Sequence, residues 1–223
     1  LPNMENLLLV LVEKLVHYNL SADLSGKMLT FPQETNTAHV TLMTSREISH
    51  TETKLKFFLL MFFTSLRRNH ILFSLATPID DAFVIFKRTA ALQSLDGQDY
   101  TLNTWHSICA TWASETDLGQ LWLDGKPSTR KFLQSEAIKG KNIILGQEQV
   151  KLGWLFAWQQ SFIGLLTDVH MWDNMLSLCE IQRYTNQTNF TPGNVLNWGA
   201  LDFQTTDRVL LENKQSDCNR SNM

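Results

Sequence analysis

The sequence is poor in charge of either sign and lacks any long apolar run. Only 18% of its 223 residues are charged, and 19 basic against 22 acidic residues leave a net charge of −3. Without a basic excess no field attracts phosphates, so nucleic-acid binding is disfavoured. The apolar run from Phe57 to Phe63 is much shorter than the roughly 20 residues that span a bilayer. We therefore expect a buried strand there and no transmembrane segment.

The sequence also lacks the spacings that mark common catalytic sites. There is no Gly-x-Ser-x-Gly elbow, no His-Glu-x-x-His, no phosphate-binding glycine loop and no Cys-x-x-Cys. Asp168 and Asp173 are five residues apart on a predicted strand, so they point to opposite faces and do not form the carboxyl pair of a glycosidase. We expect no enzyme, and keep a glycosidase on a related sandwich as a remote alternative.

What is abundant points to strands. The apolar fraction is 43%, with 7 Trp and 13 Phe, and aromatic residues favour strands. Strands are predicted over residues 57–63, 141–149 and 164–172, and Asp124-Gly125 indicates a hairpin. One helix is predicted, with Ser177 as its cap, Glu180 completing a capping box and Tyr184 at its end. The fold class is all-β: an antiparallel sandwich with one helix on a face.

The sequence can be divided into three regions, and some of its features bear on whether the chain is secreted. The apolar run Leu7–Val12 has two interpretations, a degraded secretion signal or an N-terminal helical extension, and we assign residues 1–22 to it. The domain then covers residues 23–214 and a tail covers 215–223. Asn-x-Ser/Thr triplets begin at Asn19, Asn186, Asn189 and Asn219, and they carry glycans only if the chain is secreted. Pro192 directly follows the triplet at Asn189, so that triplet is expected to be used partly at best.

Seven segments, in order, resemble the short pentraxin family: Leu29–Glu34, Phe73–Thr77, Ile108–Ser114, Leu123–Pro127, Ile144–Gln149, Met171–Asp173 and Asn194–Trp198. The resemblance covers nearly the whole chain. It implies a secreted, lectin-like jelly-roll sandwich of two sheets that assembles as a ring, usually a pentamer. It also implies binding of phosphocholine or other anionic ligands through two calcium ions on one face, and of complement on the other.

The resemblance assigns a calcium and ligand site to particular positions, and this site is incomplete. The metal positions fall on Asp80, Asp81, Glu148, Gln149 and Gln160, and the apolar contact for choline falls on Phe86. Two further acids of the family are replaced here by Val150 and Ala157, neither of which carries a side-chain oxygen. We therefore expect one weak Ca²⁺ site and the loss of the second.

The three cysteines allow at most one bridge within the chain. The family's disulfide would join Cys109 to the position of Leu59, so that bridge cannot form. We predict instead a disulfide between Cys179, at the start of the helix, and Cys218 in the tail, with Cys109 a buried thiol.

These inferences predict a secreted, acute-phase-like recognition protein of innate immunity that forms a homo-oligomer. The alternative is a diverged member of the family that assembles but no longer binds calcium or ligand.

Overall fold

The computed structural model describes residues 21–48, 55–76, 81–87, 100–113, 116–132, 140–147 and 158–214. For residues 45–48, 55–56, 76, 81–87 and 140–142 only the backbone is described. In these ranges the helical elements are α3 (Leu178–Thr185), η1 (Trp158–Gln160) and η2 (Trp198–Ala200). The strands are β1 (Lys27–Phe31), β2 (His39–Ile48), β3 (Leu55–Phe63), β4 (His70–Ala76), β5 (Asp81–Lys87), β6 (Trp105–Ala113), β7 (Leu118–Leu123), β8 (Lys126–Pro127), β9 (Lys131–Phe132), β10 (Gly140–Leu145), β11 (Gly164–Trp172), β12 (Asp202–Thr206) and β13 (Leu210–Asn213).

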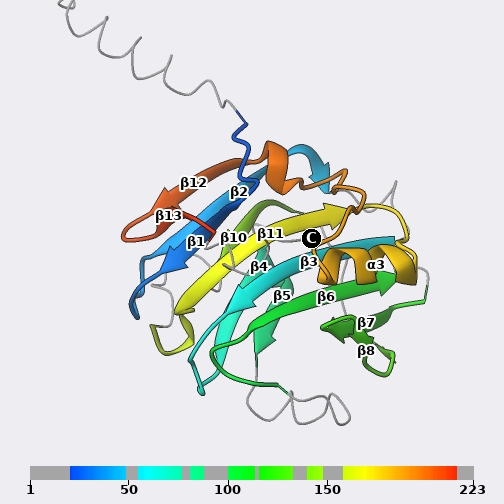
Figure 1. Cartoon of the computed structure of the whole chain (residues 1–223), viewed down its shortest axis with the longest axis horizontal. Coiled ribbons are helices and arrows are strands. Elements are labelled where there is room, and N and C mark those ends of the chain that lie inside the picture. Colours follow the sequence, from blue (N-terminus) through cyan, green and yellow to red (C-terminus); the bar gives the residue numbers. More distant parts are fainter. Residues whose placement is uncertain are drawn as a thin grey trace, which may run out of the picture.

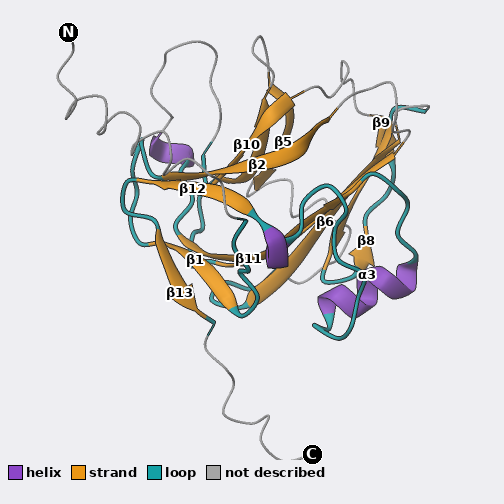
Figure 2. Cartoon of the chain, turned by 90° about the horizontal axis from the view of Figure 1, so that it is seen from above, coloured by secondary structure: helices purple, strands orange, loops and turns teal. Residues whose placement is uncertain are grey.

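The described strands form two antiparallel sheets that face each other. The larger runs in the order β13-β1-β11-β3-β6-β7-β8, with β9 also paired to β7, and the smaller in the order β12-β2-β10-β4-β5. Figure 1 shows β12, β13 and β1 on one flank and β7 and β8 on the opposite flank. Figure 2 shows α3 on the outer side of the larger sheet. This confirms the predicted sandwich with a helix on one face.

Strand β3 is apolar on both faces because each face is covered. Phe58, Leu60 and Phe62 belong to the main core between the sheets. The alternate residues Phe57, Leu59 and Met61 belong to a second cluster, which includes Ile181 and Tyr184 of α3. A strand covered on both sides reads as a continuous apolar run. The predicted buried strand at residues 57–63 is therefore confirmed, and the second cover is the helix.

The predicted hairpin forms around Asp124 and Gly125. Both have positive φ, 49° and 74°, as a two-residue type I′ turn requires, and β7 pairs with β8 across it. The Asp124 carboxylate accepts the Ser107 N–H at 2.8 Å and contacts His106 Nδ1 at 2.7 Å. Partial burial acts to raise the pKa of Asp124, but the hydrogen bonds from His106 and Ser107 outweigh it, so the pKa is lowered. The turn is thus anchored to β6 as well as closed locally.

The predicted helix forms, with two corrections. Ser177 caps α3 by accepting the Glu180 N–H at 3.2 Å, and the last helical residue is Thr185 rather than Tyr184. The Glu180 carboxylate does not close a capping box: it accepts the Thr191 N–H at 2.8 Å and pairs with Arg183. The carboxylate that the local pattern assigned to the cap is therefore hydrogen-bonded to Thr191, in the segment after the helix.

Strand β10 is shorter than the predicted 141–149. It ends at Leu145 because Gly146 has φ +84°, and a Cβ there would lie 2.4 Å from the Phe31 ring. The strand predicted over residues 164–172 is confirmed by β11. None of the helices in the described ranges has the length and apolar character needed to cross a bilayer.

The register of β3 against β6 pairs Leu59 directly with Cys109. These are the two positions that the resemblance assigned to the family's disulfide. Cys109 is 2% exposed in the cluster under α3, and burial raises the pKa of its thiol. The expectation of a buried Cys109 is confirmed, and leucine fills the place of the partner sulfur.

Candidate functional site

The strand register around β4 separates the candidate site positions into two groups. Asp81 pairs at the last residue of β4, whereas Phe86 pairs near its beginning. Near the beginning of β4 the Gly146 N–H donates to Leu72 O at 3.2 Å. Gln147, the next residue, therefore lies at this end of β4. The backbone thus brings Phe86 and Gln147 to one end of β4 and Asp81 to the other. The four residues from Leu72 to Ala76 span about 13 Å at 3.3 Å per residue.

Two glutamine residues, the buried Gln147 after β10 and the partly exposed Gln160 in η1, each have a buried amide oxygen. Gln147 Nε2 donates to Thr35 O at 2.7 Å, and Gln160 is the last residue of η1. The Oε1 atoms of both are buried without a hydrogen-bond partner among the described residues. Leaving a buried acceptor unpaired costs roughly 1–3 kcal/mol. Amide oxygens are also accepted ligands of Ca²⁺, so Gln160 fits the metal role that the sequence predicts for it.

Gln147 was missed by the sequence reasoning, although it directly precedes the predicted ligand Glu148. Asp80, Glu148 and Gln149 lie outside the described residues, and the side chains of Asp81 and Phe86 are not described. Within the described part of the chain, no three His, Cys, Asp or Glu side chains gather into a metal-binding group. That Asp80, Asp81, Glu148, Gln149 and Gln160 meet at one calcium site stays a prediction.

Arg68 holds the η1 segment in place. Its Nη1 donates to Gln159 O at 2.9 Å and to Ser161 O at 2.8 Å, and its Nη2 pairs with Glu34 at 2.8 Å. The Phe162 N–H donates to Gly146 O at 2.9 Å, which ties the same segment to the end of β10. One guanidinium therefore joins the turn that carries Gln160 to two other segments. No local sequence pattern indicates this, because its partners are far apart in the chain.

Replacing Arg68 by Ala should lower the free energy of unfolding by about 3 kcal/mol, because several acceptors lose a charged donor. Arg68→Lys should recover only part of this, since an ammonium cannot reproduce the planar fork. Urea denaturation measures both variants, and Arg208→Ala serves as control, because Arg208 is exposed and its contact with Gln33 is long at 3.5 Å; its expected change is within about 0.5 kcal/mol. Equal effects of Arg208→Ala and Arg68→Ala would contradict the clamp.

On the opposite side of the molecule, α3 and the segment after it cover a buried histidine. His170 is 4% exposed, and its Nδ1 accepts the Gly193 N–H at 3.3 Å. Its ring lies edge-on to the rings of Tyr184 and Phe190, with the Phe190 centroid at 5.1 Å. Burial lowers the pKa of His170 to about 4, although Asp168 acts in the opposite direction. This histidine is a neutral part of the core, as lone histidines on strands usually are.

The folded protein should lose stability as pH falls because of His170. Its pKa in the unfolded chain is near 6.5 and about 4 in the fold, so between these values only the unfolded state takes up the proton. The free energy of unfolding should therefore decrease by roughly 3 kcal/mol from pH 6.5 to pH 4. Urea denaturation at several pH values tests this. His170→Gln should flatten that part of the slope, and an unchanged slope in His170→Gln would contradict this explanation.

The predicted disulfide falls partly outside the structure. Within the described residues Cys109 and Cys179 form no bridge. Cys179 is exposed, and Cys218 lies outside the described residues. Lys214 Nζ donates to Asp168 Oδ2 at 2.5 Å and to Gln187 Oε1 at 3.4 Å, which holds the chain near the C-terminal end of α3. The helix is about 12 Å long, and four extended residues beyond 214 reach about 14 Å. The bridge from Cys179 to Cys218 is within reach and stays a prediction.

The comparisons with known proteins agree with this architecture. Residues 27–213 match the sequence profile described as the Pentaxin family. The chain belongs to the pentraxin family. Serum amyloid P-component of Cavia porcellus is 34% identical over 202 residues, covering 85% of this chain and 88% of that protein. C-reactive protein of Sus scrofa is 33% identical over 217 residues, covering 93% and 96%.

The fold of this pentraxin is also found in a solved structure. A native heptameric SAP-like pentraxin from Limulus polyphemus has a TM-score of 0.70 at 20% identity, covering 86% of this chain and 97% of that one. At this identity the likeness supports the fold alone. The predicted family and the predicted sandwich are both confirmed.

Proposed function

We propose that this pentraxin is a secreted recognition protein of innate immunity that binds phosphocholine or another anionic ligand through a weakened calcium site. The main support for this proposal is the family match over residues 27–213, together with the buried amide oxygen of Gln160, which has no hydrogen-bond partner among the described residues and lies at a predicted ligand position. The relatives named for serum support secretion. Membership in a family of recognition proteins supports a binding role rather than an enzymatic one.

The residues present supply oxygens for one ion better than for two. The first ion would take the carboxylates of Asp80, Asp81 and Glu148 and the carbonyl of Gln149. The second would keep only Glu148 and Gln160. Ca²⁺ takes six to eight oxygens, and extracellular calcium modules bind with Kd values of about 10⁻⁴–10⁻³ M. With Val150 and Ala157 in place of acids, we infer a millimolar or weaker first site and an empty second site.

Chromatography on immobilised phosphocholine tests the proposal. The protein should be retarded weakly in millimolar calcium and should elute unretarded when a chelator is present, because the ligand binds through the ion. A phosphate-free choline resin is the control and should not retain the protein. Strong retention in calcium would contradict the weakened site. Equal elution with calcium and with chelator would favour the alternative, a pentraxin that assembles without binding calcium or ligand.

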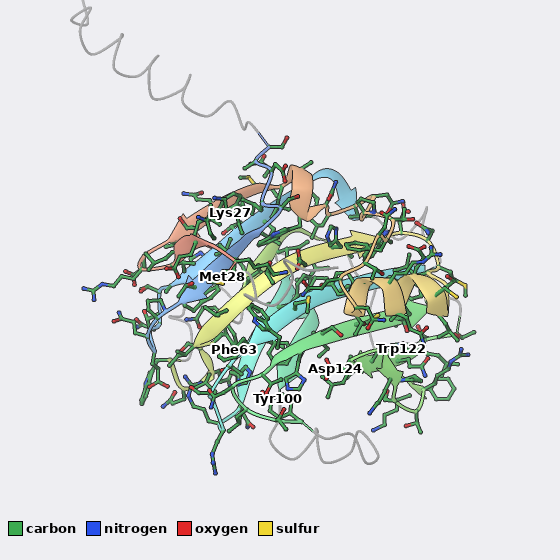
Figure 3. The ribbon with its side chains drawn as sticks, in the orientation of Figure 1. Lys27, Met28, Phe63, Tyr100, Trp122 and Asp124 are labelled. Carbon is green, nitrogen blue, oxygen red and sulfur yellow. The ribbon has the colours of Figure 1, made fainter. Side chains whose placement is uncertain are left out.

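Assembly into a ring, most simply a pentamer, is part of the proposal. The larger sheet has exposed apolar side chains at both of its described edges: Leu210 and Leu211 on β13, and Phe132 on β9 with Leu121 on β7. Figure 3 marks these flanks by Lys27 and Met28 on one side and Trp122 and Asp124 on the other. The segments Leu121–Lys131 and Asn194–Phe203, whose presence leads us to expect oligomers, belong to opposite flanks. Contact between opposite edges is head-to-tail and closes into a ring when the rotation permits.

Light scattering should report a multiple of the 25.6 kDa chain mass. Replacing both Leu210 and Leu211 by Lys should shift the protein toward the single-chain mass, because edge lysines oppose strand-edge contacts. Leu178→Lys, at an exposed leucine of α3 outside the edge strands, is the matched control and should leave the mass unchanged. A single-chain mass for the wild type would contradict assembly.

A further inference from the structure

The turn that follows α3 contains two consecutive candidates for N-linked glycosylation, Asn186-Gln187-Thr188 and Asn189-Phe190-Thr191. The two asparagines are three residues apart, so two bulky glycans would crowd each other. The structure treats the two triplets differently, and the difference allows a choice between them.

The first triplet forms an outward-facing turn. Asn186, Gln187 and Thr188 are all exposed, and the Asn186 side chain makes no hydrogen bond to any residue in the described ranges. Gln187 has φ +52°, and its N–H donates to Tyr184 O at 2.9 Å. The left-handed residue reverses the chain here, so the asparagine and the threonine stand at the surface on either side of it.

The middle residue of this triplet anchors the turn. Gln187 Nε2 donates to Met61 Sδ at 3.0 Å, and Gln187 Oε1 accepts from Lys214 Nζ at 3.4 Å. The Thr188 N–H and hydroxyl both donate to Arg183 O, at 2.9 and 3.2 Å. All these contacts use the backbone or the side chains of positions 187 and 188, so a sugar attached to the Asn186 amide disturbs none of them.

The second triplet is bound into the core at its centre. The Phe190 ring lies edge-on to Tyr184 and His170, with both centroids at 5.1 Å. The Thr191 N–H donates to Glu180, and Pro192 O accepts from Trp172 Nε1 at 3.0 Å. Pro192 also restricts Thr191 to extended backbone in the unfolded chain, which is the state that a transferase meets during secretion.

We propose that Asn186 carries a single N-linked glycan and that Asn189 is left bare. In the transfer, the Asn186 amide nitrogen attacks the anomeric carbon of a lipid-pyrophosphate-linked oligosaccharide. A C–N bond forms, the C–O bond to pyrophosphate breaks, the amide loses one proton to the transferase, and lipid pyrophosphate leaves without any redox change. The glycan covers part of the outer side of the larger sheet, where α3 lies (Figure 2), away from the smaller sheet with β4 and β5. The inference rests on the proposed function only in requiring passage through a secretory compartment.

The full chain should be expressed in mammalian cells behind a cleavable foreign secretion signal, and the protein collected from the medium. Removal of N-glycans by an amidase converts each glycosylated Asn to Asp, which peptide mass spectrometry locates. Wild type should show the conversion at position 186, and Asn186→Gln and Thr188→Ala should both lose it. Asn189→Gln is the matched control and should retain the conversion at position 186.

A bare Asn186 in secreted protein, or a glycan on Asn189 in the wild type, would overturn the inference, whatever is found at Asn19 or Asn219. The foreign signal delivers the chain to the secretory compartment regardless of its own N-terminus. Failure of the proposed function would instead show in phosphocholine chromatography, so the two failures are distinguishable. Thermal unfolding of Asn186→Gln, expected to match Asn189→Gln, excludes misfolding as the cause of a lost glycan.

Discussion

Replacing Val150 by Asp and Ala157 by Glu in one chain should make calcium-dependent retention on a phosphocholine resin strong. The two substitutions return carboxylates to the positions where the family places acids. Calcium affinity follows the number of charged ligands, so the apparent Kd should fall from about 10⁻³ M or weaker to about 10⁻⁴ M. Phosphocholine, which we infer to bridge the ions, should follow the same change.

A second double variant, with amides in place of the two acids, separates the effect of ligand charge from the effect of side-chain shape. Val150→Asn with Ala157→Gln offers oxygens of the same reach without charge, and should recover only a small part of the retention. Adding Glu148→Gln to the restored chain should abolish the gain, because both ions share that carboxylate. If the acidic pair and the amide pair behave as the wild type does, the assignment of these positions to the calcium site is wrong.

Replacing Leu59 by Cys should create a disulfide with Cys109 under mild oxidation. The two residues are direct partners in the β3–β6 register. Antiparallel partners have Cα atoms about 4.5–5.5 Å apart, within the roughly 4.4–6.8 Å that disulfides span. Closing a loop of about 50 residues stabilises the fold by about 4 kcal/mol in the chain-entropy model.

The comparison should be made between the oxidised and reduced forms of Leu59→Cys, because the loss of the leucine side chain then cancels. Chemical denaturation should show the gain, and thiol titration of the denatured protein should show two fewer free thiols after oxidation. Leu59→Ala is the control and should lose stability without any response to oxidant. Persistent reactivity of Cys109 in oxidised Leu59→Cys would contradict the register.

Features that depend on neighbouring residues were predictable from the sequence. The Asp124-Gly125 turn and the Ser177 cap each use a local pattern, and both form as expected. The seven-residue apolar run was predictable as a buried strand, but not that helix α3 supplies its second cover. The pairing of Leu59 with Cys109 followed from the family resemblance, since no local pattern specifies a register between strands 50 residues apart.

The candidate site was less predictable because its supports come from distant parts of the chain. Arg68 joins Glu34 to the carbonyls of Gln159 and Ser161, and no spacing in the sequence connects these residues. Glu180 pairs with Thr191 although the local pattern favours its own cap. In both cases a partner brought close by the fold competes with local preference.

Calorimetric titration of calcium into the native assembled protein tests the central claim most directly. The account predicts one binding event per chain with a Kd of about 10⁻³ M or weaker. Two saturable sites per chain at about 10⁻⁴ M or tighter would contradict the loss that we infer from Val150 and Ala157. The absence of any binding heat up to tens of millimolar calcium, roughly ten times the expected Kd or more, would contradict calcium-dependent recognition itself.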